Sequence, residues 1–206
     1  YLLGEKTIPS ADEAERAAAA HLLLAQRPVL SVNGNAAALV PGELVELAEA
    51  VDAALEVNLF HRSEDRVRAI ANHLRDHGAT EVLGLAGDAR IPGLDHDRAQ
   101  VDADGIYVAD VVLVPLEDGD RAAALSEMGK TEIVVDLNPL SRSAQVAAVP
   151  IIDNVVRAIP GITAHVSDLV DTDQADLEKI IEDFDPDATR ADAEKQLRSG
   201  GSLEDR

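Results

Sequence analysis

The chain has 206 residues and a formal net charge of −21, since 39 acidic residues face 18 basic ones. This balance excludes the basic face that a nucleic-acid-binding protein needs, and the absence of cysteine excludes disulfides and thiolate metal sites. No apolar run approaches the ~20 residues that span a bilayer, and no secretory signal pattern opens the sequence, so we expect no membrane association.

The predicted surface is rich in Asp and poor in Lys. Asp accounts for 23 of the 39 acidic residues, and Lys for only 4 of the 18 basic ones. Salt screens the self-repulsion of such a surface, so we expect a cytoplasmic, halophilic protein. An ordinary acidic protein with a disordered tail is the alternative. The first residue is Tyr1 rather than Met, and we interpret the sequence as a fragment of a longer chain.

Helical periodicity with matching end signals predicts three helices in the first half of the chain. Ser10 and Glu13 form a capping box at the start of the first. Pro41 suits the first turn of the second. Ser63 suits the N-cap of the third, and Gly78 its end. The predicted helices lie at 11–26, 42–53 and 64–77.

Short runs of Val, Leu and Ile predict buried strands between the helices. A long loop from Gly87 to about Gly105 interrupts their rhythm. A further helix at 119–128 is closed by Gly129. Pro160 and Gly161 should divide a last helical region into the pieces 154–159 and 162–170. The predicted strands lie at 28–33, 55–60, 81–86, 110–116, 131–137 and 147–153.

Strands that alternate with helices predict an α/β fold with a Rossmann-like, doubly wound, mostly parallel sheet and helices on both faces. We expect a single domain over residues 1–167, lacking part of its natural N-terminus. Residues 168–206 should form an acidic, partly disordered tail, because they carry 13 acidic residues against 5 basic ones. A short helix at 176–184 is expected within that tail.

Ligands bind at the carboxyl ends of the strands in open parallel sheets, so the loops there are candidate binding sites. Asn33, Gly34 and Asn35 follow the first strand. A glycine-centred turn into a helix can direct backbone N–H groups at an anion, and the carboxamides add donors. A plain Asn-Gly turn without a ligand is the alternative.

Five arginines fall in these loops, which would make a local cationic site in an acidic protein. The planar guanidinium fork suits phosphate and carboxylate. The alternative is pairing with the neighbouring Asp, as for Asp97 beside Arg98 and Asp120 beside Arg121. The five are Arg62, Arg90, Arg98, Arg121 and Arg142.

Asp118 and Asp120 in "EDGD" could hold Mg²⁺, since hard carboxylates suit that ion. An acidic turn before a helix N-terminus is the alternative. "MGKT" at 128–131 lacks the earlier glycine of a phosphate-binding loop, and no G-x-G-x-x-G fingerprint occurs, which weakens the case for a nicotinamide-dependent enzyme. The residues by themselves predict a nucleotide- or phosphate-binding α/β protein.

Seven stretches in order, from about Leu2 to about Val166, resemble the archaeal 4-phosphopantoate–β-alanine ligase family, also called phosphopantothenate synthetase. No single stretch is specific, but the set at this spacing is. The acidic tail lies outside the resemblance. The stretches are "LLGEKT", "PVLSVNGNAAALVP", "EVNLFHR", "DARIPGLDHDRAQVDADGIYVADVVLVPLEDGDR", "MGKT", "DLNPLSR" and "IIDNVVRAIP".

The resemblance implies a homodimeric, ATP-dependent ligase of coenzyme A synthesis. Such an enzyme joins 4-phosphopantoate to β-alanine through an acyl-adenylate and yields 4'-phosphopantothenate, AMP and pyrophosphate. Family members carry a further N-terminal segment with basic ATP-contacting residues before the position of Tyr1. They often have Thr where this chain has Ser143. The ATP contacts that carry over are Asp136, Leu137, Asn138, Arg142, Ser143, Asn154 and Val155.

Loop position extends these assignments as hypotheses. We expect Arg62, Arg90 and His96 to be catalytic. Substrate binding should involve Asn33, Gly34, Asn35 and Arg98. Phosphate contacts are expected from Arg121 and Lys130, and Mg²⁺ contacts from Asp118 or Asp120. A non-catalytic nucleotide-binding protein remains the alternative function.

Overall fold

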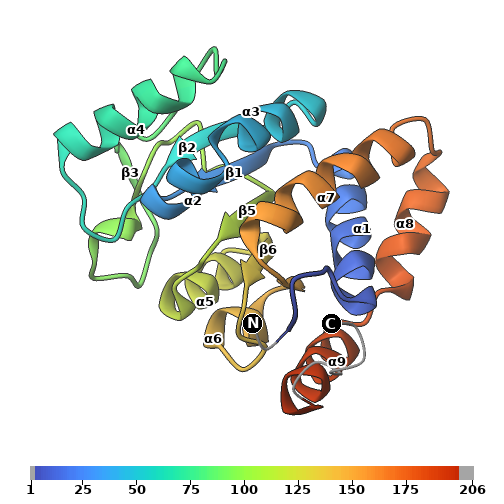
Figure 1. Cartoon of the computed structure of the whole chain (residues 1–206). Helices are drawn as coiled ribbons and strands as arrows, with labels where there is room; N and C mark the ends of the chain where they lie inside the picture. The colour runs from blue at the N-terminus through green and yellow to red at the C-terminus, as the bar shows by residue number, and fades with distance from the viewer. Residues whose placement is uncertain (1–2, 200–206) are drawn as a thin grey trace.

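A five-stranded parallel sheet runs through the centre of the computed structural model, which describes residues 3–199 (Figure 1). The strand order is β2-β1-β5-β6-β7, the flavodoxin-like order among doubly wound folds. Val29 of β1 pairs with Ala54 on one side and Val112 on the other. The strands are β1 (Pro28–Val32), β2 (Ala54–Val57), β5 (Val111–Pro115), β6 (Thr131–Asp136) and β7 (Val149–Ile152).

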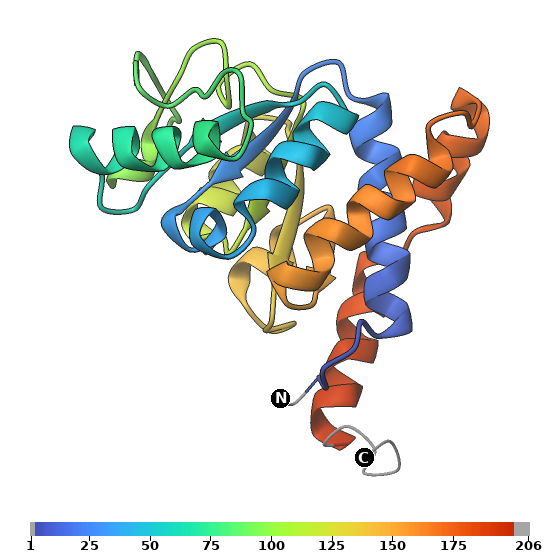
Figure 2. The same cartoon turned by 45° about the horizontal axis from the view of Figure 1, so that its top comes forward.

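Helices cover both faces of the sheet, which confirms the predicted doubly wound α/β class (Figure 2). Every residue of β1 and of β5 is buried, so both faces of the sheet are covered. The continuous Val/Ile/Leu runs in the sequence predict this burial on two sides. One face packs mainly on α1, α3 and α7. The helices are α1 (Pro9–Leu24), α2 (Gly34–Leu39), α3 (Pro41–Ala50), α4 (Glu64–Asp76), α5 (Gly119–Glu127), α6 (Arg142–Val146), α7 (Val155–Leu169), α8 (Gln174–Asp183) and α9 (Pro186–Ser199).

The opposite face packs on α5 and on the long loop between α4 and β5. Val29, Val112 and Val114 of the sheet meet Leu125 of α5 there, together with Ile91 of the loop. The loop contains a two-stranded antiparallel ribbon, β3 (Ala89–Arg90) with β4 (Gln100–Val101), and a short 3₁₀ turn, Asp97–Ala99. The loop is therefore a folded layer of the domain.

Three local predictions differ from the structure. The predicted strand at 81–86 is a single parallel bridge between Leu83 and Glu56, because Gly84 has a φ of +99° and leaves the extended conformation of a strand. Helix α1 is capped by Ile8, and Ser10 Oγ instead donates to Asp192 of α9 at 3.0 Å. Pro160 lies inside α7, which continues unbroken.

The acidic segment after α7 is largely helical. α8 confirms the helix predicted at 176–184, whereas residues 186–199, predicted to be solvated, form α9. Ala193 is fully buried and Thr189 nearly so, in contact with the rest of the domain. Helix α7 runs through the expected domain boundary at 167/168 to Leu169. The rest of the tail prediction, residues 200–206, lies outside the described residues.

Among the described residues, 3–199, no helix has the length and apolarity needed to cross a membrane.

Candidate functional site

The strand order reverses its direction between β1 and β5, so the carboxyl ends of these two strands form the topological switch point of the sheet. Asn33 follows β1 and caps α2, since its Oδ1 accepts hydrogen bonds from the backbone of Asn35 and Ala36, both at 3.0 Å. Its Nδ2 donates to the Pro115 carbonyl at 2.7 Å and so joins the ends of β1 and β5. The Asn33 carboxamide therefore shapes the switch point, while the exposed Asn35 borders it.

The loop after α4 is anchored on two polar side chains of β2 and its end. Glu56 is fully buried and accepts hydrogen bonds from the backbone of Asp102 at 3.0 Å and of Ile106 at 2.6 Å. Burial raises its pKa to about 7, although these two hydrogen bonds lower it. Asn58 donates to the carbonyls of Arg98 and Gln100 and accepts from Arg98 Nε at 3.2 Å.

Asp102 closes the loop on itself. Its carboxylate accepts from Gly84 N at 2.7 Å and from Gly87 N at 2.5 Å. A side chain at Gly84 has no room, because a Cβ there would lie 2.3 Å from the Val57 carbonyl oxygen. Glycine at this position lets the loop lie directly against β2.

Three predicted catalytic residues lie on or beside this loop. Arg62 Nη2 donates to the Gly84 carbonyl at 2.6 Å, while its buried Nη1 has no hydrogen-bond partner among the described residues. Arg90 is exposed, and its Nη2 donates to the Leu94 carbonyl at 2.7 Å. His96 stacks on Phe60 with ring centroids 5.0 Å apart. These side chains lie near the end of β2.

A cavity lies along helix α4, from Arg62 just before its start to Arg75 in its last turn. This cavity, of about 460 Å³, is lined by three arginines and one carboxylate, together with Val67, Asn72 and Leu85. The charged residues are Arg62, Arg68, Arg75 and Glu64. Three cations against one carboxylate leave this cavity positive, which favours an anionic group. A second cavity, of about 870 Å³, lies between α1, α8 and α9, away from the strand edge.

Two of the five loop arginines are buried in an ion cluster beneath the edge. Glu117 follows β5, and its carboxylate lies 3.0 Å from Arg98 Nη1 and 3.0 Å from Arg121 Nη1. Arg121 is fully buried and also donates to Ser31 Oγ at 2.9 Å. Burial, and secondarily Arg121, lower the pKa of Arg98 to about 10. Because Arg121 is enclosed, it stabilises the loops at the carboxyl edge. The predicted contact between Arg121 and a phosphate is therefore wrong.

The predicted ion-pair alternatives named the wrong partners for these two arginines. Asp97 accepts from the backbone of Arg62 at 2.9 Å instead of pairing with Arg98. Asp120 pairs with Arg142 at 2.7 Å, and both side chains are exposed. Burial draws Arg98 and Arg121 to the enclosed Glu117 carboxylate, whereas the exposed Asp residues interact with neighbours on the surface.

Glu132 of β6 lies against the same cluster, 2% exposed, and no donor within residues 3–199 reaches its two carboxyl oxygens. Its carboxyl group lies beside that of Glu117, which accepts a hydrogen bond from it when Glu132 is protonated. Burial and the nearby Glu117 raise its pKa. The folded state therefore holds a proton that the unfolded chain releases above the ordinary pKa of 4.5. The contribution of Glu132 to the free energy of unfolding therefore falls as pH rises from about 4.5 towards its folded-state pKa, by up to about 1.4 kcal/mol per pH unit.

Glu132→Gln should remove this dependence. We expect the variant to match the parent near pH 5 and to be more stable than the parent at pH 8, because the amide cannot ionise. Urea unfolding at pH 5, 6, 7 and 8 and constant salt measures both profiles. Parallel profiles would show that Glu132 does not hold the proton.

The two Mg²⁺ candidates lie at the start of α5. Asp118 caps that helix by accepting from Asp120 N at 2.8 Å, and its Oδ2 lies 3.7 Å from His96 Nε2. No third His or acidic ligand joins them within residues 3–199. The pair fits the role of one or two carboxylates on a metal that substrate phosphates also bind, and not an all-protein metal cage.

The loop between β6 and α6 is organised by Asp136. Its Oδ1 accepts from Asn138 N at 3.0 Å, and its Oδ2 accepts from Ser141 Oγ at 2.7 Å and from Ser143 Oγ at 3.2 Å. Ser141 in turn caps α6. The exposed Leu137 and Arg142 flank this turn, so the structure brings together the residues of the motif "DLNPLSR".

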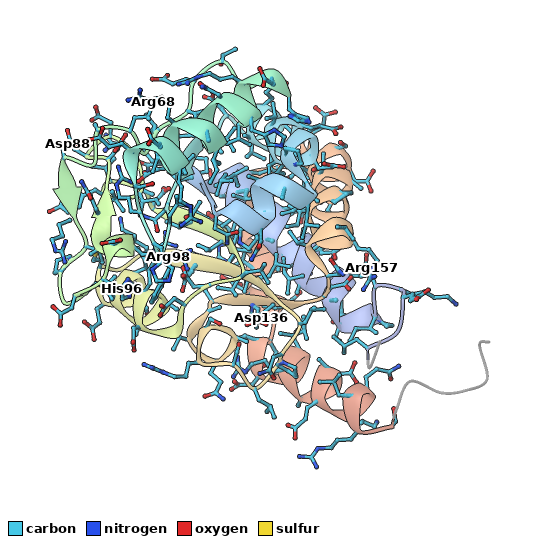
Figure 3. All side chains as sticks on the ribbon, turned by 60° about the vertical axis from the view of Figure 1, so that its left-hand side comes forward. Arg68, Asp88, His96, Arg98, Asp136 and Arg157 are labelled. Atoms are coloured by element: carbon cyan, nitrogen blue, oxygen red, sulfur yellow. The ribbon has the colours of Figure 1, made fainter. Side chains whose placement is uncertain are left out.

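The neighbouring loop after β7 is built in the same way. Asp153 is 2% exposed, pairs with Arg157, and accepts from Thr7 Oγ1 at 2.7 Å. Asn154 caps α7 by accepting from Val156 N at 3.2 Å, and Val155 begins the helix. Figure 3 labels His96, Arg98, Asp136 and Arg157 in succession, from the long loop to α7. The candidate site thus extends along the carboxyl edge.

Lys130 is the predicted site residue that the structure places elsewhere. It immediately precedes β6, so it lies at the opposite, amino edge of the sheet. Its Nζ donates to the carbonyls of Tyr107 at 2.9 Å and Ala109 at 2.7 Å, and burial lowers its pKa. The "MGKT" lysine stabilises a loop end there.

Sequence reasoning missed the residues that hold the loops: Glu56, Asn58, Asp102, Glu117 and Asp153. A signal existed for the first two, since a carboxylate and a carboxamide alternate with valine in the buried run "EVN". Buried polar groups need hydrogen-bond partners, so such a run indicates a second segment packed on the strand.

The strand order and the polar loops gathered along the carboxyl edge define a ligand-binding protein of the doubly wound α/β class. A sequence model of the phosphopantothenate/pantothenate synthetase family matches residues 10–200, and the chain belongs to this family. The match confirms the resemblance found in the motifs. It extends through residues 168–200, so the placement of the acidic segment outside the resemblance was wrong.

Individual relatives agree with the family. The 4-phosphopantoate–β-alanine ligase of Thermococcus onnurineus is 54% identical over 199 residues, which cover 96% of this chain and 76% of the relative. The Thermococcus kodakarensis ligase is 53% identical with the same coverage. The Methanosarcina mazei ligase is 49% identical over 198 residues, 96% of this chain and 78% of the relative.

Proposed function

We propose that this protein is an ATP-dependent 4-phosphopantoate–β-alanine ligase of coenzyme A biosynthesis. The observation that carries the proposal is about 50% identity, over nearly the whole chain, to relatives that bear this name. Every relative named above is a ligase, which leaves the non-catalytic alternative without support. ATP and 4-phosphopantoate are both polyanions, and the exposed loop arginines at the carboxyl edge suit them.

The reaction has two steps. The carboxylate of 4-phosphopantoate attacks the α-phosphorus of ATP, which releases pyrophosphate and leaves an acyl-adenylate. The amine of β-alanine, after losing a proton, attacks the acyl carbon and displaces AMP. Both steps need positioning and charge stabilisation more than a protein nucleophile. The chain has no cysteine, and this route requires none.

We assign ATP to the loops after β6 and β7. The turn held by Asp136 presents Leu137, Asn138, Arg142 and Ser143, and the N-terminus of α7 presents Asn154 and Val155. Asp118 or Asp120 would hold Mg²⁺ on the phosphates, where the ion neutralises charge. Lys130 is left out of this set because it lies at the other edge.

The organic substrates occupy the β1–β2 side in this proposal. Arg62 and Arg90 bind the phosphate and carboxylate groups. The cavity that Arg62 lines with Arg68 and Arg75 supports the role of Arg62. His96, which stacks on the Phe60 ring, lies beside the reacting groups. Gly34 and Asn35 border the substrate at the start of α2. Arg98 and Arg121 act through Glu117, by fixing the loops that carry these groups.

Three properties from the sequence remain proposals. We expect a homodimer, a cytoplasmic location and activity at high salt. Size-exclusion chromatography with light scattering in molar KCl tests the first, and an assay from low to molar KCl tests the last.

Product analysis tests the function directly. The chain is incubated with ATP, Mg²⁺, 4-phosphopantoate and β-alanine, and each component is omitted in turn. We expect AMP and 4'-phosphopantothenate only when all substrates are present. Two results would contradict the ligase assignment. One is ADP as the nucleotide product, and the other is AMP that forms equally well when β-alanine is omitted.

Asp136→Ala should raise the KM for ATP at least tenfold, which corresponds to about 1.4 kcal/mol of binding. The substitution removes the acceptor that orders the β6–α6 turn. Asp173→Ala is the matched control, because Asp173 is also a helix cap, accepting from Asp176 N at 3.0 Å, but lies at α8. Steady-state kinetics of both folded variants should show the KM effect for Asp136 alone.

A further inference from the structure

Three side chains with potential metal-ligating atoms lie together between α1 and α7, and none of them is assigned to the reaction. Asp12 and Glu15 are one turn apart on α1, and His165 projects from α7. One ligating atom from each lies within 4.8 Å of the other two, and no other group of three meets this condition among the residues the structure describes. His165 Nε2 lies 3.1 Å from Asp12 Oδ1.

Glu15 gives an independent indication of a missing ligand. The residue is 2% exposed, and its buried Oε1 has no hydrogen-bond partner within residues 3–199. An unsatisfied buried acceptor costs about 1–3 kcal/mol, so native structures rarely keep one without a reason. The charges nearby add to this cost, since Asp153 and Asp12 are both close, with Arg157 as the opposing cation.

The opposite helix makes room for this carboxylate. Gly161 lies in the interior of α7, where glycine costs about 1 kcal/mol relative to alanine. A Cβ at Gly161 would lie 2.0 Å from Glu15 Oε2. The helix therefore carries the residue type that leaves the Glu15 carboxylate in place between the helices.

We propose that Asp12, Glu15 and His165 bind a first-row divalent transition metal of the Zn²⁺ type, which joins α1 to α7. Mixed imidazole and carboxylate ligands suit Zn²⁺, whereas Mg²⁺ and Ca²⁺ prefer oxygen alone. Ligands about 2.0–2.1 Å from a tetrahedral ion lie about 3.3 Å apart, so small side-chain rotations complete the set. The exposed side of Asp12 leaves the fourth position to water.

The test uses Co²⁺ as a spectroscopic probe on chelator-treated full chain, without ATP or substrates, so it is independent of the ligase proposal. We expect one equivalent of Co²⁺ to give the intense visible absorption of a tetrahedral site. Equimolar Zn²⁺ should abolish that absorption, and millimolar Mg²⁺ should leave it unchanged. Zn²⁺ should also raise the thermal unfolding midpoint.

Two variants locate the site. His165→Ala and the isosteric Glu15→Gln should each weaken Co²⁺ binding at least tenfold. His73→Ala is the control, because His73 and His77 pair on α4 with ring centroids 4.5 Å apart and could chelate a metal by themselves. Unchanged binding in folded His165→Ala and Glu15→Gln, loss of binding in His73→Ala, or no binding by the parent would each overturn the proposal.

Discussion

Gly84→Ala should destabilise the protein by about 3 kcal/mol and lower kcat/KM at least tenfold. Alanine meets two penalties there, a strained φ of +99° and a Cβ 2.3 Å from the Val57 carbonyl oxygen. The obstacle is backbone of β2, so the loop must move instead. Gly84 N would then leave Asp102, and the Gly84 carbonyl would leave Arg62.

Gly93→Ala is the matched control for this effect. Gly93 also has a positive φ, +77°, but a Cβ there would meet nothing within 4 Å. We expect a cost of about 1–2 kcal/mol from backbone strain alone. Urea unfolding measures both variants. Equal losses of stability at the two positions would show that contact with β2 does not hold the loop.

Glu117→Gln should cost about 3 kcal/mol of unfolding free energy. Breaking a buried ion pair by removing one partner costs about 3–5 kcal/mol, because the remaining charge stays buried without compensation. Here Arg98 and Arg121 would both lose their carboxylate, and the Glu117 side chain is fully buried. The low end of the range applies because Glu132 can ionise beside the two arginines and replace part of the charge.

Arg198→Ala provides the comparison for Glu117→Gln. Arg198 pairs with Glu194 on α9, and its side chain is 76% exposed. A surface pair of this kind contributes up to about 1 kcal/mol. Denaturant unfolding at pH 7 should separate the two variants clearly. A Glu117→Gln variant as stable as Arg198→Ala would mean that the buried cluster contributes specificity of structure and little stability.

The strands of the sheet were predictable because burial on both faces requires apolar residues within each short segment. Each of β1, β2, β5, β6 and β7 overlaps a predicted strand that is rich in Val, Ile or Leu. The failed strand at 81–86 has an apolar run too, but Gly84 needs a positive φ to approach β2. Pro160 inside α7 is a second failure, since packing of that helix outweighs its local cost.

The sequence by itself determined the fold class, the carboxyl edge as the place of the loops, and the family to which the chain belongs. Those conclusions rest on local patterns and on motif order, which the chain carries directly. The tertiary structure alone decided the role of each charge. Glu117 pairs with the distant Arg98 as well as with Arg121 one helical turn away, because low-dielectric burial joins charges that the sequence keeps apart.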